Sequence, residues 1–190
     1  MKIHNEIKIA APLDQILALV DDVPRLAGCV PGAELLEQTG LDTYRGRVKV
    51  KLGPVALSFN GVFQLSEKNN TTHQILAKAK GNEERARGSA SANIIFFLRE
   101  ENGQTHISVD SDIQLTGAVA QYGRATSVVQ GTAQAIMTQF AQNLEASLSG
   151  NTAKSDNELR IASTIAQGLW NAGRDLFKER TKKDDGVQKN

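Results

Sequence analysis

Apolar and polar residues alternate along most of the first 117 positions of this chain. Near the start, Ile3, Ile7 and Ile9 alternate with polar or charged residues, which predicts a half-buried first strand. From residue 33 to residue 117 the same period of two predicts five further long strands. Their apolar or inward positions are Tyr44, Val48, Val50 and Leu52; Val55, Leu57, Phe59, Phe63 and Leu65; His73, Ile75, Ala77 and Ala79; Ala90, Ala92, Ile94, Phe96 and Leu98; and Ile107, Val109, Ser111, Ile113 and Leu115. Long sequential strands that are polar on one side predict one strongly curved antiparallel sheet.

Two short helices are predicted after the first strand. Pro12 can open the first helix, whose apolar positions are Ile16, Leu17, Leu19 and Val20. Residues 22–29 form the second, which must stop before Val30-Pro31-Gly32.

The apolar pattern of residues 112–148 predicts a strand that ends at Gly117 and runs into one long helix. Its apolar stripe is formed by Val119, Tyr122, Val129, Ile136, Met137, Phe140, Leu144 and Leu148. The opposite side carries Arg124, Ser127, Gln134, Gln142 and Glu145. Thr126 and Ala133 lie in the middle of the stripe, where bulkier residues would be needed to fill a core. The helix is therefore expected to cover the sheet and leave a cavity beneath it.

The last forty residues form a separate segment. We expect a polar linker at 150–155, an amphipathic helix at 156–180 and a disordered tail at 181–190. This helix needs an apolar surface, which can be its own domain, a partner or second copy, or the membrane interface. Aromatic residues with nearby lysines favour reversible docking to a membrane or partner. The predicted docking residues are Leu159, Ile165, Leu169, Trp170, Leu176 and Phe177.

Composition narrows the function classes. The 190 residues carry 22 Lys and Arg against 21 Asp and Glu, so no global field attracts nucleic acid. Aromatic residues make up 5%, which disfavours a base-stacking surface. The single cysteine excludes an internal disulfide, and no stretch resembles a signal peptide or a membrane span. A cytoplasmic globular protein is expected, with a peripheral position on the inner face of the cytoplasmic membrane if the last helix docks there.

The residues do not form a recognisable catalytic or metal-binding motif. The three histidines, His4, His73 and His106, are predicted on separate strands without metal-ligand spacing, and only His73 points inward by alternation. Cys29 is expected to be a packed, inert thiol. Residues 81–88 are typical of a charged hairpin tip, because they lack a phosphate-binding glycine motif.

A basic strand face is the remaining charged feature. It is interpreted as a solvated exterior, with docking to an acidic partner or anionic headgroups as the alternative. Its members are Arg45, Arg47, Lys49 and Lys51.

Four segments resemble the CoxG family of carbon monoxide dehydrogenase subunits, within the START-like (SRPBCC) superfamily. They are Leu26–Glu34, Arg47–Leu65, Asp112–Arg124 and Gln139–Leu148, and the resemblance covers about residues 1–148 in matching order. It implies an α+β helix-grip domain at 1–149, similar to Bet v 1, with about seven strands wrapped around a long C-terminal helix and a lipophilic cavity between them. It also implies an accessory role for a molybdenum hydroxylase of the carbon monoxide dehydrogenase type, either recruiting the enzyme to the membrane or carrying a quinone. The family is not known for chemistry of its own.

The expected ligand is quinone-like or lipid-like, such as menaquinone or ubiquinone, because many apolar and few polar residues face the predicted cavity. The predicted polar contacts are Tyr44, His73, Ser111 and Tyr122. The predicted apolar lining is Val48, Val50, Leu57, Phe59, Phe63, Ile75, Phe96, Val109, Tyr122, Thr126, Val129, Ala133, Met137 and Phe140. No catalytic cofactor, metal or nucleic acid is expected.

Two alternatives stay open. START-like proteins include hydrolases, cyclases and sensors, in which a few polar groups of the pocket do the chemistry. A docking adaptor with a filled core would need no ligand at all.

Overall fold

The computed structural model describes residues 1–124 and 126–150. The predicted helix at 156–180, the tail at 181–190 and most of the predicted linker lie outside the described residues.

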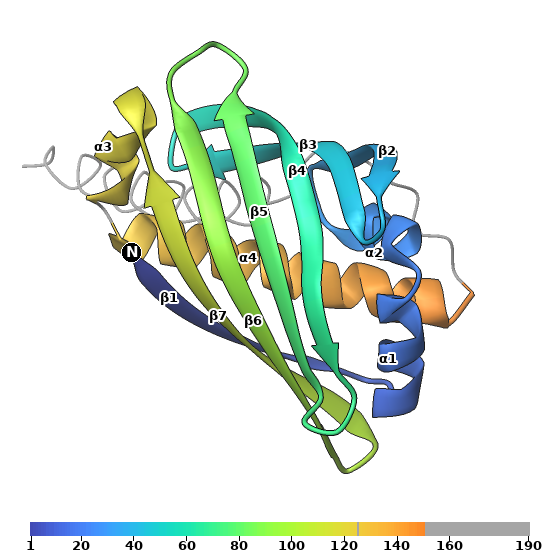
Figure 1. Cartoon of the computed structure of the whole chain (residues 1–190). Helices are drawn as coiled ribbons and strands as arrows, with labels where there is room; N and C mark the ends of the chain where they lie inside the picture. Colours follow the sequence, from blue (N-terminus) through green and yellow to red (C-terminus); the bar gives the residue numbers. More distant parts are fainter. Residues whose placement is uncertain (125, 151–190) are drawn as a thin grey trace, which may run out of the picture. The chain divides into compact units, whose positions relative to one another are not determined.

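Seven antiparallel strands form one sheet in the order β1-β7-β6-β5-β4-β3-β2 (Figure 1). Strands β2 to β7 form a meander, and the first strand pairs with the last, from Lys2 opposite Asp112 to Ile9 opposite Thr105. The predicted α+β fold class is confirmed. The strand bounds are β1 Lys2–Ile9, β2 Ala33–Gly40, β3 Thr43–Leu52, β4 Val55–Asn69, β5 Gln74–Glu83, β6 Ser89–Glu101 and β7 Gln104–Leu115.

Helices α1 (Leu13–Val20) and α2 (Val23–Cys29) follow the first strand as predicted. Pro12 precedes α1 in an extended conformation, and the Asp22 carboxylate caps α2 by accepting the Arg25 N–H at 3.1 Å. Both helices lie near the C-terminal end of the long helix in Figure 1.

The prediction of one unbroken helix after β7 is wrong. The chain forms a 3₁₀ turn, η1 (Gly117–Val119), then α3 (Ala120–Gly123), and then the long helix α4 (Thr126–Leu148). Gly117 ends the strand with a φ of +65°, and α3 ends at Gly123, a residue with low helix propensity. The break lets η1 and α3 close one end of the sheet while α4 crosses its concave side (Figure 1).

Three glycines lie in one cross-strand row where β3, β4 and β5 pair. Gly46 lies opposite Gly61, and Gly61 lies opposite Gly81. A Cβ on Gly61 would come within 2.2 Å of the Lys80 carbonyl oxygen, a contact that no side chain tolerates. The backbones therefore approach each other more closely here than ordinary residues allow, and this row permits the sheet to curve tightly.

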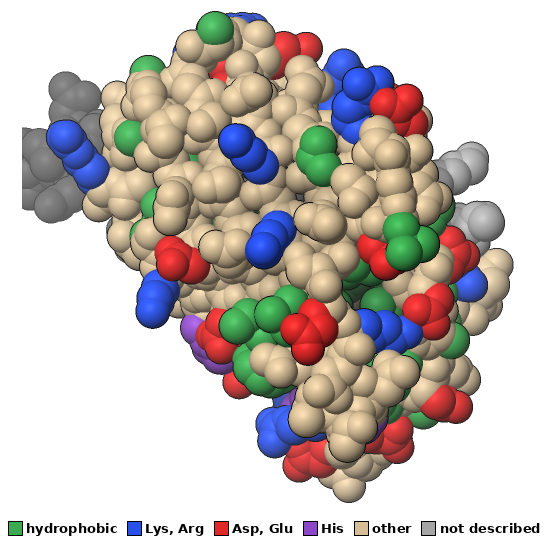
Figure 2. All heavy atoms as spheres, in the orientation of Figure 1, with side chains coloured by type: hydrophobic (Ala, Val, Ile, Leu, Met, Phe, Trp, Pro, Cys, Tyr) green, Lys and Arg blue, Asp and Glu red, His purple; other side chains and the backbone are tan. Residues whose placement is uncertain are grey.

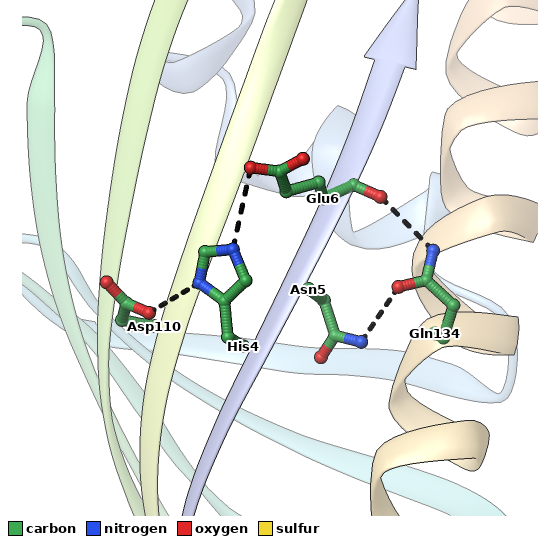
Figure 3. Close-up of polar contacts among 5 residues, drawn as sticks. All are labelled: His4, Asn5, Glu6, Asp110 and Gln134. Atoms are coloured by element: carbon green, nitrogen blue, oxygen red, sulfur yellow. Dashed lines mark hydrogen bonds and ion pairs between the residues drawn. The ribbon is translucent and has the colours of Figure 1, made fainter.

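Polar side chains fix α4 to the edge strand β1. The buried Asn5 side chain donates from Nδ2 to Oε1 of Gln134 at 2.8 Å, and Gln134 Nε2 donates to the Glu6 carbonyl at 3.1 Å (Figure 3). Further along the helix, the Glu145 carboxylate accepts the Ala10 N–H at 2.7 Å. The sequence pattern places Gln134 and Glu145 on the side of the helix opposite the apolar stripe, and β1 runs along that side and supplies their partners.

Glycine substitutions at two positions should change stability in opposite directions. Gly61→Ala should lower the free energy of unfolding by about 1–3 kcal/mol or more, because the new Cβ meets backbone that cannot move aside. Gly131→Ala, the matched control within α4, should raise it by about 0.5–1 kcal/mol, since nothing lies within 4 Å of its Cβ position and alanine favours helix. Urea unfolding followed by circular dichroism measures both. A neutral Gly61→Ala variant would show that the glycine row is not required for the curvature.

Candidate functional site

The concave side of the sheet, under α4, is the candidate site. Its inward side chains form two apolar clusters. The larger one joins β1, α1 and α2 to parts of β5–β7 and the C-terminal half of α4, with Ile9, Ile16 and Leu144 among its most buried members. The smaller one is centred on Leu57, Phe59 and Val119, where β4 meets η1.

Most of the predicted ligand-binding residues belong to one of these two clusters. Buried or partly buried in the larger cluster are Ile75, Phe96, Val109, Met137 and Phe140. In the smaller cluster are Val48, Val50, Leu57, Phe59 and Tyr122. Outside both clusters are the buried Tyr44 and Val129 and the half-buried Phe63, Ser111 and Ala133.

A row of cross-strand neighbours passes between the two clusters, and we call it the central row. On β6, Ala90 belongs to the smaller cluster and Ile94 to the larger one, so Ala92 lies between them. Strand pairing extends this position across five strands, and the full row is Tyr44, Phe63, Ala79, Ala92 and Ile113. Two alanines thus occupy the middle of the row, between larger side chains on either side.

On α4, Ala133 is a further small, half-buried residue that belongs to neither cluster. A cavity on the concave side would be expected where the inward side chains are this small, because larger side chains would otherwise fill the space. The central row with Ala133 is therefore the place where an apolar ligand would lie. Tyr44 at one end of the row and Ser111, one row closer to the larger cluster, are the polar groups nearest to it along the sheet.

The four predicted polar contacts were expected to converge on the ligand, and this prediction is wrong for His73. This residue lies in the turn between β4 and β5 with a φ of +49°, not on a strand, so its predicted inward direction by alternation is wrong. The Asn69 side chain accepts the N–H groups of Thr71 and Thr72, which forms the turn and delays β5 until Gln74. His73 therefore lies six positions, about 20 Å, along the strand from Ala79 of the central row.

Two further predicted positions differ from expectation. Thr126 is exposed in the first turn of α4, where its hydroxyl donates to the Gly123 carbonyl, so it does not line the concave side. Tyr122 lies on α3 in the smaller cluster, at the end of the sheet, because the helix breaks between it and α4.

The turn between β5 and β6 contains an ion pair that the sequence pattern does not reveal. Glu83 follows the inward alternation of β5 and is 3% exposed, so its interpretation as part of a charged tip is wrong. Its carboxylate lies 2.7 Å from Arg87 Nη2 and accepts the N–H groups of Arg85 and Arg87. The Arg87 guanidinium and these N–H groups lower the pKa of Glu83 to about 2, so the carboxylate is ionised at neutral pH and organises the turn.

Cys29 is buried, as predicted, and burial raises the pKa of its thiol. Its carbonyl accepts the Asn143 side chain at 2.9 Å, which ties α2 to α4. Within residues 1–124 and 126–150, no three His, Cys, Asp or Glu side chains lie close enough to hold a metal ion. No helix in the same residues is long and apolar enough to cross a lipid bilayer.

Half of the basic strand face is neutralised by its neighbour β2. Arg45 pairs with Glu37 at 2.7 Å and Arg47 with Glu34 at 3.5 Å. The remaining Lys49 and Lys51 are exposed along the same strand. This pairing favours the interpretation of a solvated exterior over that of a strongly basic docking surface.

Comparison with known families and structures places the fold. The model of the CoxG family, a subunit family of carbon monoxide dehydrogenase, matches residues 6–149. A conserved protein from Geobacillus kaustophilus is similar at a TM-score of 0.68 and 15% identity, over 79% of this chain and 96% of that one. The ZhuI aromatase/cyclase from Streptomyces sp. R1128 is similar at a TM-score of 0.55 and 14% identity, over 78% and 95% of the two chains. Identities this low show a shared fold only. A search of curated protein sequences gave no match.

A tryptophan placed above the central row distinguishes a cavity from a filled core. Ala133→Trp should leave the domain folded and abolish binding of an apolar ligand, because the indole would occupy ligand space. The matched control Ala141→Trp changes a residue that is buried in the larger cluster, where overpacking should cost about 1–3 kcal/mol or more. Urea unfolding and fluorescence titration with a hydrophobic dye measure the two effects. Equal destabilisation by both substitutions, with no dye binding to the unsubstituted protein, would mean that the space is filled.

Proposed function

Because the chain belongs to the CoxG family of carbon monoxide dehydrogenase subunits, we propose that it is a non-enzymatic accessory protein that binds a hydrophobic ligand on behalf of a molybdenum hydroxylase. The observation that carries this proposal is the central row, in which the small side chains of Ala79 and Ala92 lie between two apolar clusters. A protein that needed only a packed core would place larger side chains at these positions.

The ligand class follows from the chemistry of the concave side. Apolar residues predominate there, and the hydroxyl groups of Tyr44 and Ser111 are the polar groups close to the central row. A ligand that buried about 300 Å² of apolar surface would gain roughly 7–8 kcal/mol before the costs of association. One or two hydrogen bonds would then set its orientation. A quinone with an apolar tail, such as menaquinone or ubiquinone, has this combination of a carbonyl-bearing ring and a lipophilic chain.

The partner proposal rests on the family. A hydroxylase of the carbon monoxide dehydrogenase type releases electrons, and a quinone carrier would link it to the membrane pool. In this proposal the docking residues predicted between Leu159 and Phe177 reach the membrane or the enzyme, while the domain at 1–149 holds the ligand.

An enzymatic function is the second candidate, because an aromatase/cyclase has the same fold. In the described part of the chain, the polar side chains nearest the central row are the hydroxyls of Tyr44 and Ser111, and neither is hydrogen-bonded to a general base. This arrangement favours binding over conversion, and a turnover measurement separates the two.

Quinone binding should be measurable with short-chain analogues. We expect menaquinone or ubiquinone analogues to bind with micromolar or tighter affinity by isothermal titration calorimetry, and chromatography should recover them unchanged. Ala79→Phe should weaken binding about tenfold or more by filling the central row. Lys80→Phe, the next residue on the outer face, is the matched control and should bind normally. If neither quinones nor fatty acids bind at micromolar concentration, the carrier proposal is wrong, and conversion of a bound compound would favour the enzyme.

Truncation tests the docking part of the proposal. A chain without residues 151–190 should remain folded and keep its ligand, but should no longer associate with anionic liposomes or with the purified hydroxylase. Circular dichroism, ligand titration and liposome co-sedimentation measure these properties. If the truncated chain unfolds, the C-terminal segment is required by the domain itself and does not serve as a docking element.

A further inference from the structure

A hollow of about 310 Å³ lies on the opposite side of the sheet from the central row. It is built where β1, β7 and β6 pair. Six of the residues around it occupy outward positions of these strands, and the other three, Ile7, Leu98 and Ile107, have side chains in the larger apolar cluster. None of the residues predicted to bind the hydrophobic ligand lines it. Figure 2 shows the outer face of the sheet, where apolar, acidic, basic and histidine side chains gather over the lower half.

Strand register places three basic residues in one row of this hollow. His106 on β7 lies opposite Lys8 on β1 and opposite Arg99 on β6. The three side chains therefore occupy neighbouring outward positions, with strands spaced about 4.8 Å apart. His106 is the most enclosed of them, with 13% of its side chain exposed.

The next row is of a different kind. Ser108 lies opposite Glu6 and opposite Phe97, so a hydroxyl stands between a carboxylate and an aromatic ring. Phe97 is 40% exposed although it is a large apolar residue on the outer face of a sheet. Ile95, two residues away on the same face, is half-buried and extends the apolar surface.

The hollow is flanked by side chains of both charges, and the two signs differ in their partners. Both carboxylates near it have partners, since Glu6 lies 3.5 Å from His4 Nε2 (Figure 3) and Glu101 lies 3.5 Å from His106 Nε2. His4 is also held by Asp110 at 2.7 Å. Lys8 and Arg99 form no ion pair with any residue in 1–124 and 126–150. This pair of cations contrasts with the β3 face, where the arginines are paired with glutamates of β2.

We propose that this hollow is a second ligand site, which binds a small anion whose carboxylate or phosphate is attached to a flat apolar group. The anionic group would lie between Lys8 and Arg99, where the donors of His106 and Ser108 can also reach it. The apolar group would cover Phe97. A volume of about 310 Å³ is at the lower end of the range for small-molecule pockets and accommodates one ring with its acidic group.

The test uses the isotope-labelled full-length protein and defined probes. Phenylacetate, phenyl phosphate and the neutral benzyl alcohol are each titrated while backbone amide and histidine side-chain resonances are recorded by NMR. We expect saturable shifts at His106 and Ser108 with at least one anionic probe, and at least fivefold weaker binding of benzyl alcohol. The two anionic probes show whether carboxylate or phosphate is preferred. Raising the salt concentration should weaken the anionic binding, because exposed charges are screened.

Variants assign the binding to the hollow. Lys8→Gln with Arg99→Gln should weaken the anionic probe about fivefold to tenfold. The matched control, Lys78→Gln with Lys80→Gln, removes two exposed cations from the same face on β5 and should leave binding unchanged. Phe97→Ser should weaken both anionic probes, with folding checked by the dispersion of the NMR spectrum. Three results would overturn the proposal. The neutral probe could bind as tightly as the anionic ones, or the control variant could lose as much binding as the test variant. The third is that no probe gives a saturable shift up to about 20 mM, roughly the weakest binding that such a site would need. Because quinone binding is measured separately, its failure leaves this result unaffected.

Discussion

One helix has to cover the concave side of seven strands, and most of the structure follows from this difference in width. Seven strands spaced about 4.8 Å apart would span roughly 29 Å if flat, whereas a helix with its side chains is about 10–12 Å wide. The sheet therefore has to curl, and the row of Gly46, Gly61 and Gly81 lets it do so. The helix α4 does not cover the whole concave side. Helices α1 and α2 cover one end of it, and η1 and α3 cover the other.

The attachment of α4 is polar along one side and apolar along the other. Asn5 and Gln134 join it to β1 through partly buried hydrogen bonds, and Asn143 joins it to α2. Amide side chains with hydrogen-bond partners favour one position of the helix, because any shift would leave these groups without partners. The apolar side can then keep small residues above the central row without loss of a defined geometry.

Period-two alternation was sufficient to predict six of the seven strands, because most inward positions of strands such as β1 and β4 are marked by Ile, Val, Leu or Phe. It did not predict β2, which is largely exposed. The family resemblance, which the family model confirms, added the wrapping of the sheet around a helix. Local pattern failed where tertiary partners decide. Glu83 is inward but paired with Arg87, Gln134 is polar but faces β1, and His73 is drawn into a turn by Asn69. The central row was also out of reach, since it depends on the register of four hairpins, and bulges such as that between Leu65 and Glu67 shift register without a clear sequence signal.

The pairing of β1 with β7 sets the order in which the domain can fold. Lys2 to Ile9 leave the ribosome before the other strands, yet their partners between Thr105 and Asp112 come about a hundred residues later. The meander from β2 to β7 can form from neighbouring hairpins, whereas β1 has to wait for the final strand, and α4 cannot bind Asn5 until both are in place. Closing so long a loop costs conformational entropy before any contact between the strands forms. The first strand should therefore join the sheet late, and refolding should be slow for a domain of this size. During synthesis, three isoleucines of an unpaired β-strand thus stay exposed while about a hundred further residues are added.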